Sequence, residues 1–193
     1  MDMARQTTAR KPVKPVKDTG AKLLEAAAKE FRAHGFFGTD TNKIARRAGF
    51  APQTFYRWFA DKTAIFLAVY RAWEEEEKNV LADLHQRSAP IGDMVDAVVA
   101  HHRKYLLFRR SLRQLSVEDA AVRRARAESR LRQIERFRKW QGDASLDTAQ
   151  IATMLFEVER LCDAIAEGEF DDLGLDDGMA RKAVAELITR MRG

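Results

Sequence analysis

Five side chains of polar or aromatic type crowd into one short segment: Gln53, Thr54, Tyr56, Arg57 and Trp58. If this segment is a helix, Phe55 and Phe59 lie four residues apart on its inner face and the five side chains remain outside. Such a set can donate and accept hydrogen bonds and offer a methyl group, which are the contacts used to read base edges in the major groove. The pattern therefore predicts a DNA-reading surface.

Residues for catalysis or metal binding form no such group. We find no nucleophile with a nearby base, no paired carboxylates and no phosphate-binding glycine loop. His101 and His102 are adjacent, so on a helix their side chains diverge by about 100° and do not share a metal ion. The single cysteine, Cys162, can form neither an internal disulfide nor a cysteine zinc site, and its apolar surroundings predict a buried, inert thiol. We expect no enzyme, no metal and no cofactor.

Composition favours a globular protein that does not enter a membrane. The chain has 193 residues, of which 46% are hydrophobic and 33% charged, enough for a core in one large or two small domains. No run of apolar residues is long enough to span a bilayer, and the basic N-terminus lacks the apolar stretch of a secretory signal. The sequence thus predicts a cytoplasmic protein.

Charge is distributed unevenly along the chain. Residues 1–73 hold 14 Lys and Arg against 6 Asp and Glu, whereas residues 141–193 hold 5 against 12. A basic N-terminal third indicates a module that binds a polyanion. Residues 1–17 alternate basic residues with Pro12 and Pro15, which predicts a flexible basic arm.

Helical periodicity runs through the rest of the chain, and no segment shows the alternation of a strand. Asp18 or Thr19 is a suitable cap for the first helix, Asp40 for the second and Asp61 for the fourth. Residues 168–174 are expected to form a turn. The predicted helices cover 19–34, 41–48, 52–58, 61 to about 85, 91–114, 118–141, 146–167 and 177–191, so the fold class is all-α.

The second and third predicted helices are arranged as in a helix-turn-helix unit. Ala45 and Ala48 are small enough for two helices to cross closely, and Gly49 allows the tight turn between them. Pro52 lies at the first position of the third helix, where proline is tolerated.

The segment GFFGTDTNKIARRAGFAPQTFYRWFADKTAIF, from Gly35 to Phe66, resembles the DNA-binding segment of the tetracycline-repressor (TetR) family. The resemblance covers about residues 18–70. Thr41, Ala51 and Gln53 depart from the common pattern, and Ala51 replaces a serine cap. The matching positions are Gly35-Phe36, Thr39, Ile44-Ala45, Ala48-Gly49, Phe55-Tyr56, Phe59, Lys62 and Phe66.

After the basic arm (1–17), the resemblance implies a helix-turn-helix DNA-binding domain (18–64) and an effector-binding and dimerisation domain (65–193). It implies a homodimer on a palindromic operator in double-stranded DNA. By the same resemblance, Thr41 and Asn42 lie close to phosphate or a base edge. Gln53, Thr54 and Tyr56 face the major groove, and Trp58 and Lys62 approach phosphates.

The resemblance also implies that the last two long helices pair between subunits. Their stripes, at 146–167 and 177–191, are wide enough for an isologous interface, and the alternative is that they are ordinary core. For a small-molecule effector, histidines and aromatic side chains are the candidates, with buried core as the alternative for each. These candidates are His101, His102, Tyr105, Phe108, Phe137, Trp140 and Phe156.

Two functions remain open at this stage. The first is a ligand-responsive repressor in which the effector tilts the fourth helix and DNA fit is lost. The second is a DNA-binding regulator without an effector, architectural or constitutive. The arginines of 123–139 are expected to be solvated or paired, with attraction of an acidic effector or additional DNA as the alternative.

Overall fold

The computed structural model describes residues 16–140 and 146–192, and these ranges are helical and contain no strand. The predicted all-α class is confirmed. The described residues form ten helices: α1 (Val16–His34), α2 (Thr41–Arg47), α3 (Pro52–Tyr56), α4 (Lys62–Gln86), α5 (Ile91–Lys104), α6 (Leu106–Glu118), α7 (Ala120–Trp140), α8 (Thr148–Glu167), α9 (Glu169–Asp172) and α10 (Gly178–Arg192). Most of the predicted basic arm lies outside the described residues.

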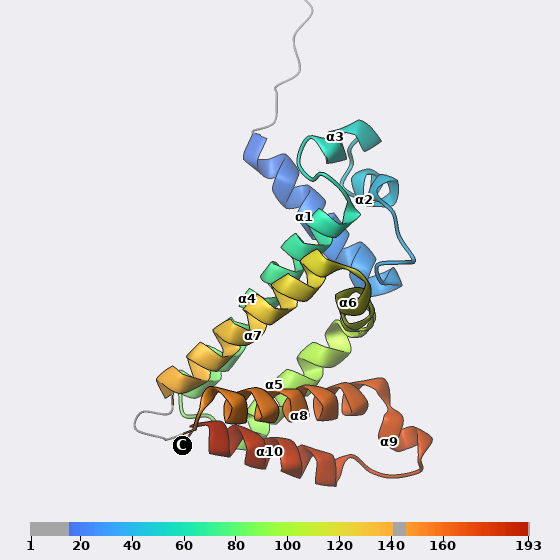
Figure 1. Cartoon of the computed structure of the whole chain (residues 1–193). Coiled ribbons are helices and arrows are strands. Elements are labelled where there is room, and N and C mark those ends of the chain that lie inside the picture. Colours follow the sequence, from blue (N-terminus) through green and yellow to red (C-terminus); the bar gives the residue numbers. More distant parts are fainter. Residues whose placement is uncertain (1–15, 141–145, 193) are drawn as a thin grey trace, which may run out of the picture.

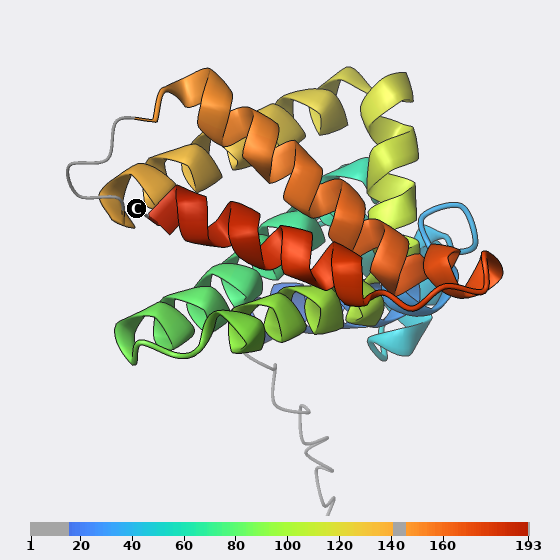
Figure 2. The same ribbon diagram turned by 90° about the horizontal axis from the view of Figure 1, so that it is seen from below.

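The helices form a small unit at one end and a larger bundle below it. Figure 1 shows α1, α2 and α3 gathered at the top, α8 and α10 together at the bottom, and α4 and α7 running between these ends. Seen from below, α10 lies between α8 and α5, and it packs against both (Figure 2). No helix in residues 16–140 and 146–192 combines the length and apolar character needed to cross a bilayer.

Two apolar clusters fill the interior. The first joins α1 to α4 with α6 and the start of α7, and it buries Phe31, Phe55, Phe66 and Phe108 almost completely. The second joins the end of α4 with α5, α7, α8 and α10. Because Phe66 and Phe108 share the first cluster with Phe31, that cluster crosses the domain boundary predicted at 64/65.

The long apolar stripes of α8 and α10 lie largely in the second cluster. Ile151, Cys162, Val184 and Met191 are all fully buried within one protomer. The ordinary-core alternative therefore describes most of these residues, because α5 and α7 cover them within the protomer.

Two of the predicted helix caps, Asp40 and Asp61, are confirmed. The carboxylate of Asp40 accepts the Lys43 N–H at 2.8 Å, and that of Asp61 accepts the Ala64 N–H at 2.7 Å. Asp147 forms a capping box with Gln150 at the start of α8. Each satisfies backbone N–H groups that the first turn of a helix leaves free.

Several helix boundaries differ from prediction. The first helix begins at Val16, so Asp18 is not its cap; it lies in the first turn and pairs with Lys22 at 2.6 Å. Helix α3 ends at Tyr56 and not at residue 58. The expected turn at 168–174 contains the short helix α9.

The predicted single helix over 91–114 is wrong, because the chain breaks at Tyr105. This residue adopts φ −114° and ψ 24°, which ends α5 and redirects the chain into α6. The Tyr105 hydroxyl donates to Glu76 of α4 at 2.5 Å, a contact between residues far apart in sequence. Neither glycine nor proline marks the break, so local patterning did not reveal it.

Gly20, inside α1, allows the ring of Trp58 to approach. A Cβ on Gly20 would lie 2.7 Å from Trp58 Cε3, closer than carbon atoms approach. Glycine in a helix normally costs about 1 kcal/mol relative to alanine, so its presence here is explained by the close contact.

We predict that Gly20→Ala fails to stabilise the fold, because Trp58 must move. The matched control is Gly92→Ala in α5, where a Cβ meets nothing within 4 Å. Gly92→Ala is expected to raise the free energy of unfolding by about 0.5–1 kcal/mol. Urea denaturation measures both, and an equal gain for the two variants would contradict the proposed contact.

Candidate nucleic-acid interface and interior cavity

The α2–α3 unit is held by a few buried residues. Ile44, Ala45 and Phe55 are completely buried against the first cluster. Gly49 adopts φ +79°, the left-handed conformation that glycine permits, and the Phe50 N–H then donates to the Ala45 carbonyl at 2.9 Å. The predicted tight turn at Gly49 is therefore confirmed.

This scaffold leaves the predicted reading side chains at the surface. Gln53, Tyr56, Arg57 and Trp58 are exposed and Thr54 is half-buried, with Tyr56 58% exposed. The Tyr56 hydroxyl lies 3.0 Å from Thr41 Oγ1, so a hydrogen bond joins the start of α2 to the end of α3. Asn42, next to Thr41, is also exposed. Thus the start of α2 and the end of α3, which carry predicted DNA contacts, meet at Thr41 and Tyr56.

Lys62 has a role in the fold that its position in the motif did not indicate. Its ammonium donates to the carbonyls of Phe36 at 2.9 Å and Thr39 at 3.0 Å, and it lies over the Phe36 ring. Burial lowers the pKa of this ammonium, against a smaller opposing effect of Asp40. Two of its three donors are therefore used inside the chain, and the predicted phosphate contact is left to the third.

The Phe36 peptide is held from two helices at once. Its carbonyl accepts from Lys62 of α4, and its N–H donates to Ser111 Oγ of α6 at 2.9 Å. Phe36 lies in the turn between α1 and α2, so both long-range contacts fix the turn that leads into the DNA-binding helices.

Two basic residues on α2 were not among the predicted contacts. Lys43 and Arg46 are exposed, and no carboxylate of the described residues lies within 4.0 Å of either. By contrast, Arg47 is engaged, since its Nε donates to buried Glu30 at 2.5 Å. A count of charges along α2 would have found Lys43 and Arg46, but not the difference between them and Arg47.

A cavity of about 70 Å³ lies inside the helical bundle. Its wall is apolar at the level of Leu81, Met94 and Trp140 and charged at the level of Arg109 and Arg130. The remaining lining residues are Tyr70, Trp73, Glu77, Val98, His102, Leu112, Gln133, Arg136, Phe137, Leu155, Val158, Glu159, Ile188 and Met191.

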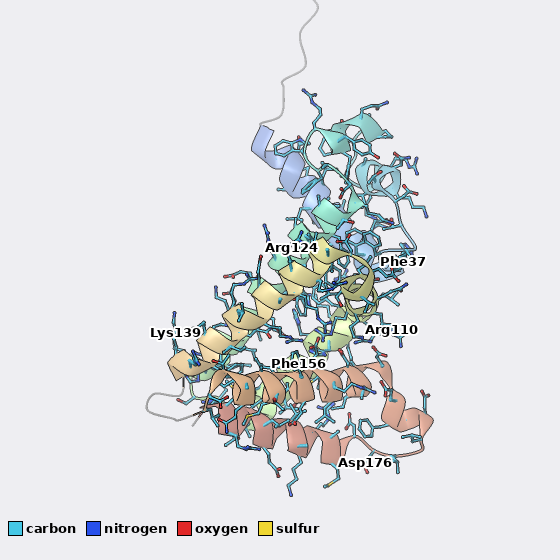
Figure 3. All side chains as sticks on the ribbon, in the orientation of Figure 1. Phe37, Arg110, Arg124, Lys139, Phe156 and Asp176 are labelled. Atoms are coloured by element: carbon cyan, nitrogen blue, oxygen red, sulfur yellow. The ribbon has the colours of Figure 1, made fainter. Side chains whose placement is uncertain are left out.

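Three of the seven predicted effector residues line this cavity: His102, Phe137 and Trp140. The other four do not. Tyr105 and Phe108 belong to the first apolar cluster, and His101 lines a separate hollow beside Glu76 and Lys104. Phe156 is 56% exposed on α8, where Figure 3 labels it. Helix periodicity places a side chain on a face but does not say which neighbour covers that face.

Charged residues that the sequence analysis did not single out form the polar part of the cavity wall. Arg109 is 4% exposed, its Nε donates to Asp163 at 2.7 Å, and its Nη2 lies 3.2 Å from Glu159. Nδ1 of His102 lies 2.9 Å from the same oxygen of Asp163. Burial alone raises the pKa of Asp163, but His102 and Arg109 outweigh burial and hold that pKa below its usual range. Burial and the charge of Arg109 lower the pKa of His102 to about 4.

The arginines of α7 are mostly paired, as expected for the Arg-rich segment at 123–139. Arg132 binds Glu74 of α4 through two hydrogen bonds of 3.0 and 2.7 Å, and Arg126 and Arg130 both contact Glu159 of α8. Arg124 is exposed on the same helix (Figure 3). Cys162 is fully buried as predicted, and burial raises the pKa of its thiol to about 12.

Comparison with known proteins agrees with this geometry. Residues 23–69 match the family described as "Bacterial regulatory proteins, tetR family". The HTH-type transcriptional regulator YdgC of Bacillus subtilis is 44% identical over 45 residues, which is 23% of this chain and 23% of that protein. The match to this curated relative therefore spans less than a quarter of its length.

Solved structures share the fold over most of the chain. A protein from Rhodococcus sp. assigned to the TetR family superposes with a TM-score of 0.70 at 18% identity, covering 92% of this chain and all of the other. A second structure, from Mesorhizobium loti, superposes with a TM-score of 0.66 at 16% identity, covering 93% of this chain and 97% of the other. FadR from Bacillus subtilis, in complex with stearoyl-CoA, superposes with a TM-score of 0.55 at 17% identity. The superposition covers 87% of this chain and 96% of FadR.

The fold and the exposed α3 surface define a DNA-binding regulator. It consists of an N-terminal helix-turn-helix domain and a helical domain that follows it. Residues 23–69 therefore form a TetR-family DNA-binding domain, and the chain shares its fold with solved structures assigned to that family.

His101 provides a test of the buried charge arrangement. Neither ring nitrogen has a hydrogen-bond partner among the described residues, and burial lowers the His101 pKa to about 4. An unfolded histidine has a pKa of about 6.5, so between these values the unfolded state binds a proton that the folded state does not. The free energy of unfolding therefore falls as the pH falls from 6.5 to 4.

We predict that His101→Phe reduces the fall in the free energy of unfolding on acidification. The centroid of the His101 ring lies 5.1 Å from that of Trp73 and 4.9 Å from that of Tyr105, and a phenylalanine ring keeps both contacts. The variant should be at least as stable as the wild type at pH 7 and about 1–2 kcal/mol more stable at pH 5. Urea denaturation at both pH values measures this, and equal losses on acidification in the two proteins would show the prediction to be wrong.

Proposed function

We propose that this protein is a ligand-responsive transcriptional repressor that binds a palindromic operator as a homodimer in the cytoplasm. The observation that carries the proposal is the exposed set of hydrogen-bonding side chains on α3, held on a scaffold whose inner residues are completely buried. Rigid presentation of such side chains is what major-groove reading requires.

In this proposal the roles of the side chains follow their exposure. Gln53, Thr54 and Tyr56 read base edges, while Thr41 and Asn42 lie at the start of α2 beside the phosphates. Basic and aromatic side chains at the rim, Arg57, Trp58, Lys62, Lys43 and Arg46, add contacts to the DNA backbone. Lys62 contributes with one donor and otherwise supports the α1–α2 turn.

A two-fold dimer through α8 and α10 is supported by a groove on their outer side. Phe156, Leu161 and Leu187 supply apolar surface there, and the groove is also lined by Glu157, Arg160, Glu186 and Arg190. Both charge signs around an apolar centre suit an isologous interface, in which each surface meets its own copy. Two-fold symmetry would match a palindromic operator.

Two helices connect the cavity with the DNA-binding unit. Helix α4 carries Trp73 at the cavity and Lys62 at the Phe36 carbonyl, and α6 carries Arg109 at the cavity and Ser111 at the Phe36 N–H. A ligand that shifts either helix therefore changes the position of the α1–α2 turn. Binding of ligand and of DNA would then oppose each other, by the reciprocity of coupled sites.

The second candidate is a regulator without an effector. The small cavity favours it, since about 70 Å³ lies below the roughly 300–1,000 Å³ typical of ligand pockets. Side-chain displacement would be needed for most ligands. FadR, which shares this fold, is described in complex with stearoyl-CoA, which supports the view that such bundles can hold a long apolar ligand.

We predict that Tyr56→Ala and Gln53→Ala each weaken binding to DNA fragments selected from the genome by the wild-type protein. Each lost base contact should cost about ten- to a hundredfold in affinity. Fluorescence anisotropy measures the affinity, and thermal unfolding should be nearly unchanged because both side chains are exposed. The control is Leu173→Ala, 72% exposed after α9, and unchanged DNA affinity of both α3 variants would refute the assignment.

For the dimer, we predict that Ala183→Glu, in the α8–α10 groove, shifts the protein to monomers by placing a charge in the interface. Thr189→Glu, on another face of α10 and exposed, is the matched control. Sedimentation velocity over a range of concentrations measures the dimer. Equal association of both variants would place the interface elsewhere.

A further inference from the structure

The polar part of the cavity wall and the ion pairs next to it contain more cations than carboxylates. Glu159 alone contacts Arg109 at 3.2 Å, Arg126 at 3.1 Å and also Arg130. Asp163 likewise faces Arg109 and Arg113, with His102 beside it. Of these groups, Arg109, Arg130, Glu159 and His102 line the cavity itself, together with Arg136 and Glu77. The cavity wall therefore carries three guanidinium groups against two carboxyl groups.

Hydrogen-bond donors are also left over at this end. The indole N–H of Trp73 and the Nε–H of Arg130 have no partner among the described residues, and both side chains line the cavity. Trp73 is 4% exposed, so bulk water does not readily accept a hydrogen bond from its indole N–H. Buried donors without partners destabilise a fold by about 1–3 kcal/mol each, and both groups require an acceptor.

Glu77, the other acid in the cavity wall, does not supply the missing charge. Burial raises its pKa and so favours its neutral form, although Arg109 and Arg136 oppose this. Its nearest basic partner is His101, whose Nδ1 lies 3.8 Å away. Arg136, also in the wall, has no carboxylate of the described residues within 4.0 Å.

Another part of the cavity wall is mainly apolar, although Arg136 lies one helical turn from Trp140. Leu81, Met94, Phe137, Trp140 and Met191 line it and belong to the second cluster or pack against it. Along α7, Arg130 and Trp140 are ten residues apart, about 15 Å of helix. Met94 and Met191 are unbranched, so they can move aside for an elongated apolar group.

We propose that this cavity binds an unbranched apolar molecule with one acidic headgroup, with the headgroup at Arg130 and Trp73 and the tail toward Trp140. The acid supplies the negative charge and the acceptor that the polar end lacks. The inference rests on the proposed ligand-responsive function and names the class of its effector. Carboxylate and phosphate headgroups share this chemistry.

Isothermal titration calorimetry of the full chain with octanoate, octyl phosphate, octanol and octylamine tests the proposal. One or both of the anions should bind at least about tenfold more tightly than octanol and octylamine, because only they pair with the guanidinium groups. The two anions distinguish a carboxylate from a phosphate headgroup. Equal or tighter binding of octanol or octylamine, or no binding of either anion, would overturn the proposal.

Variants locate the headgroup. Trp73→Phe keeps an aromatic ring but removes the pyrrole ring with its N–H, and Arg130→Gln removes the charge. Each should weaken binding of the preferred anion by about tenfold. Arg124→Gln, which removes an exposed arginine from the same helix, should leave the affinity unchanged. If Arg130→Gln does not fold, Trp73→Phe decides. Wild-type affinity in Trp73→Phe, or equal losses in Arg124→Gln, would exclude this headgroup position.

DNA affinity separates this inference from the proposed function. If the anion binds without lowering DNA affinity, the ligand class stands and the ligand-responsive function fails. If octanol or octylamine binds and releases DNA instead, the function stands and the acidic ligand class is wrong.

Discussion

The buried guanidinium of Arg109 is the group on which much of the architecture depends. A charge so deeply buried needs counter-charge and hydrogen bonds, and α8 supplies both through Asp163 and Glu159. The requirement fixes the position of α6 against α8. Two residues further along α6, Ser111 accepts the Phe36 N–H, so the same short helix also reaches the DNA-binding unit. One ionic contact thus lies between the two apolar clusters and helps to set their relative position.

The ion pairs around Arg109, Asp163 and Glu159 bear on both the stability of the fold and the recognition of a ligand. Buried ion pairs commonly contribute little net stability, since desolvation of the charges opposes their attraction. Here several guanidinium groups share few carboxylates, and Trp73 and Arg130 retain donors without partners. Incomplete satisfaction of this kind is typical of functional sites and not of optimised cores. A cavity beside such groups is therefore a more informative feature than its small volume would indicate.

At the other end of the molecule, internal polar contacts decide which motif residues remain available. Arg47 is bound by buried Glu30, and Lys62 is largely occupied by backbone carbonyls. Gly20 exists because the Trp58 ring packs on α1. The sequence alone does not distinguish Arg47 and Lys62 from other surface charges, or Gly20 from other helix residues. The resemblance identified the right segment, but the division between scaffold and reading surface depends on contacts between α1, α2 and α4.

Local chemistry explains what the sequence alone determined: the all-α class, the caps at Asp40 and Asp61, and the tight turn at Gly49. These depend on residues within a few positions of one another, where periodicity, capping and backbone preferences act. The tertiary structure alone decided the break at Tyr105, the cover of the α8 and α10 stripes, and which side chains line the cavity. Those features arise from contacts between residues tens of positions apart, such as Arg109 with Asp163, and a helical pattern shows that a face is apolar without showing what packs against it.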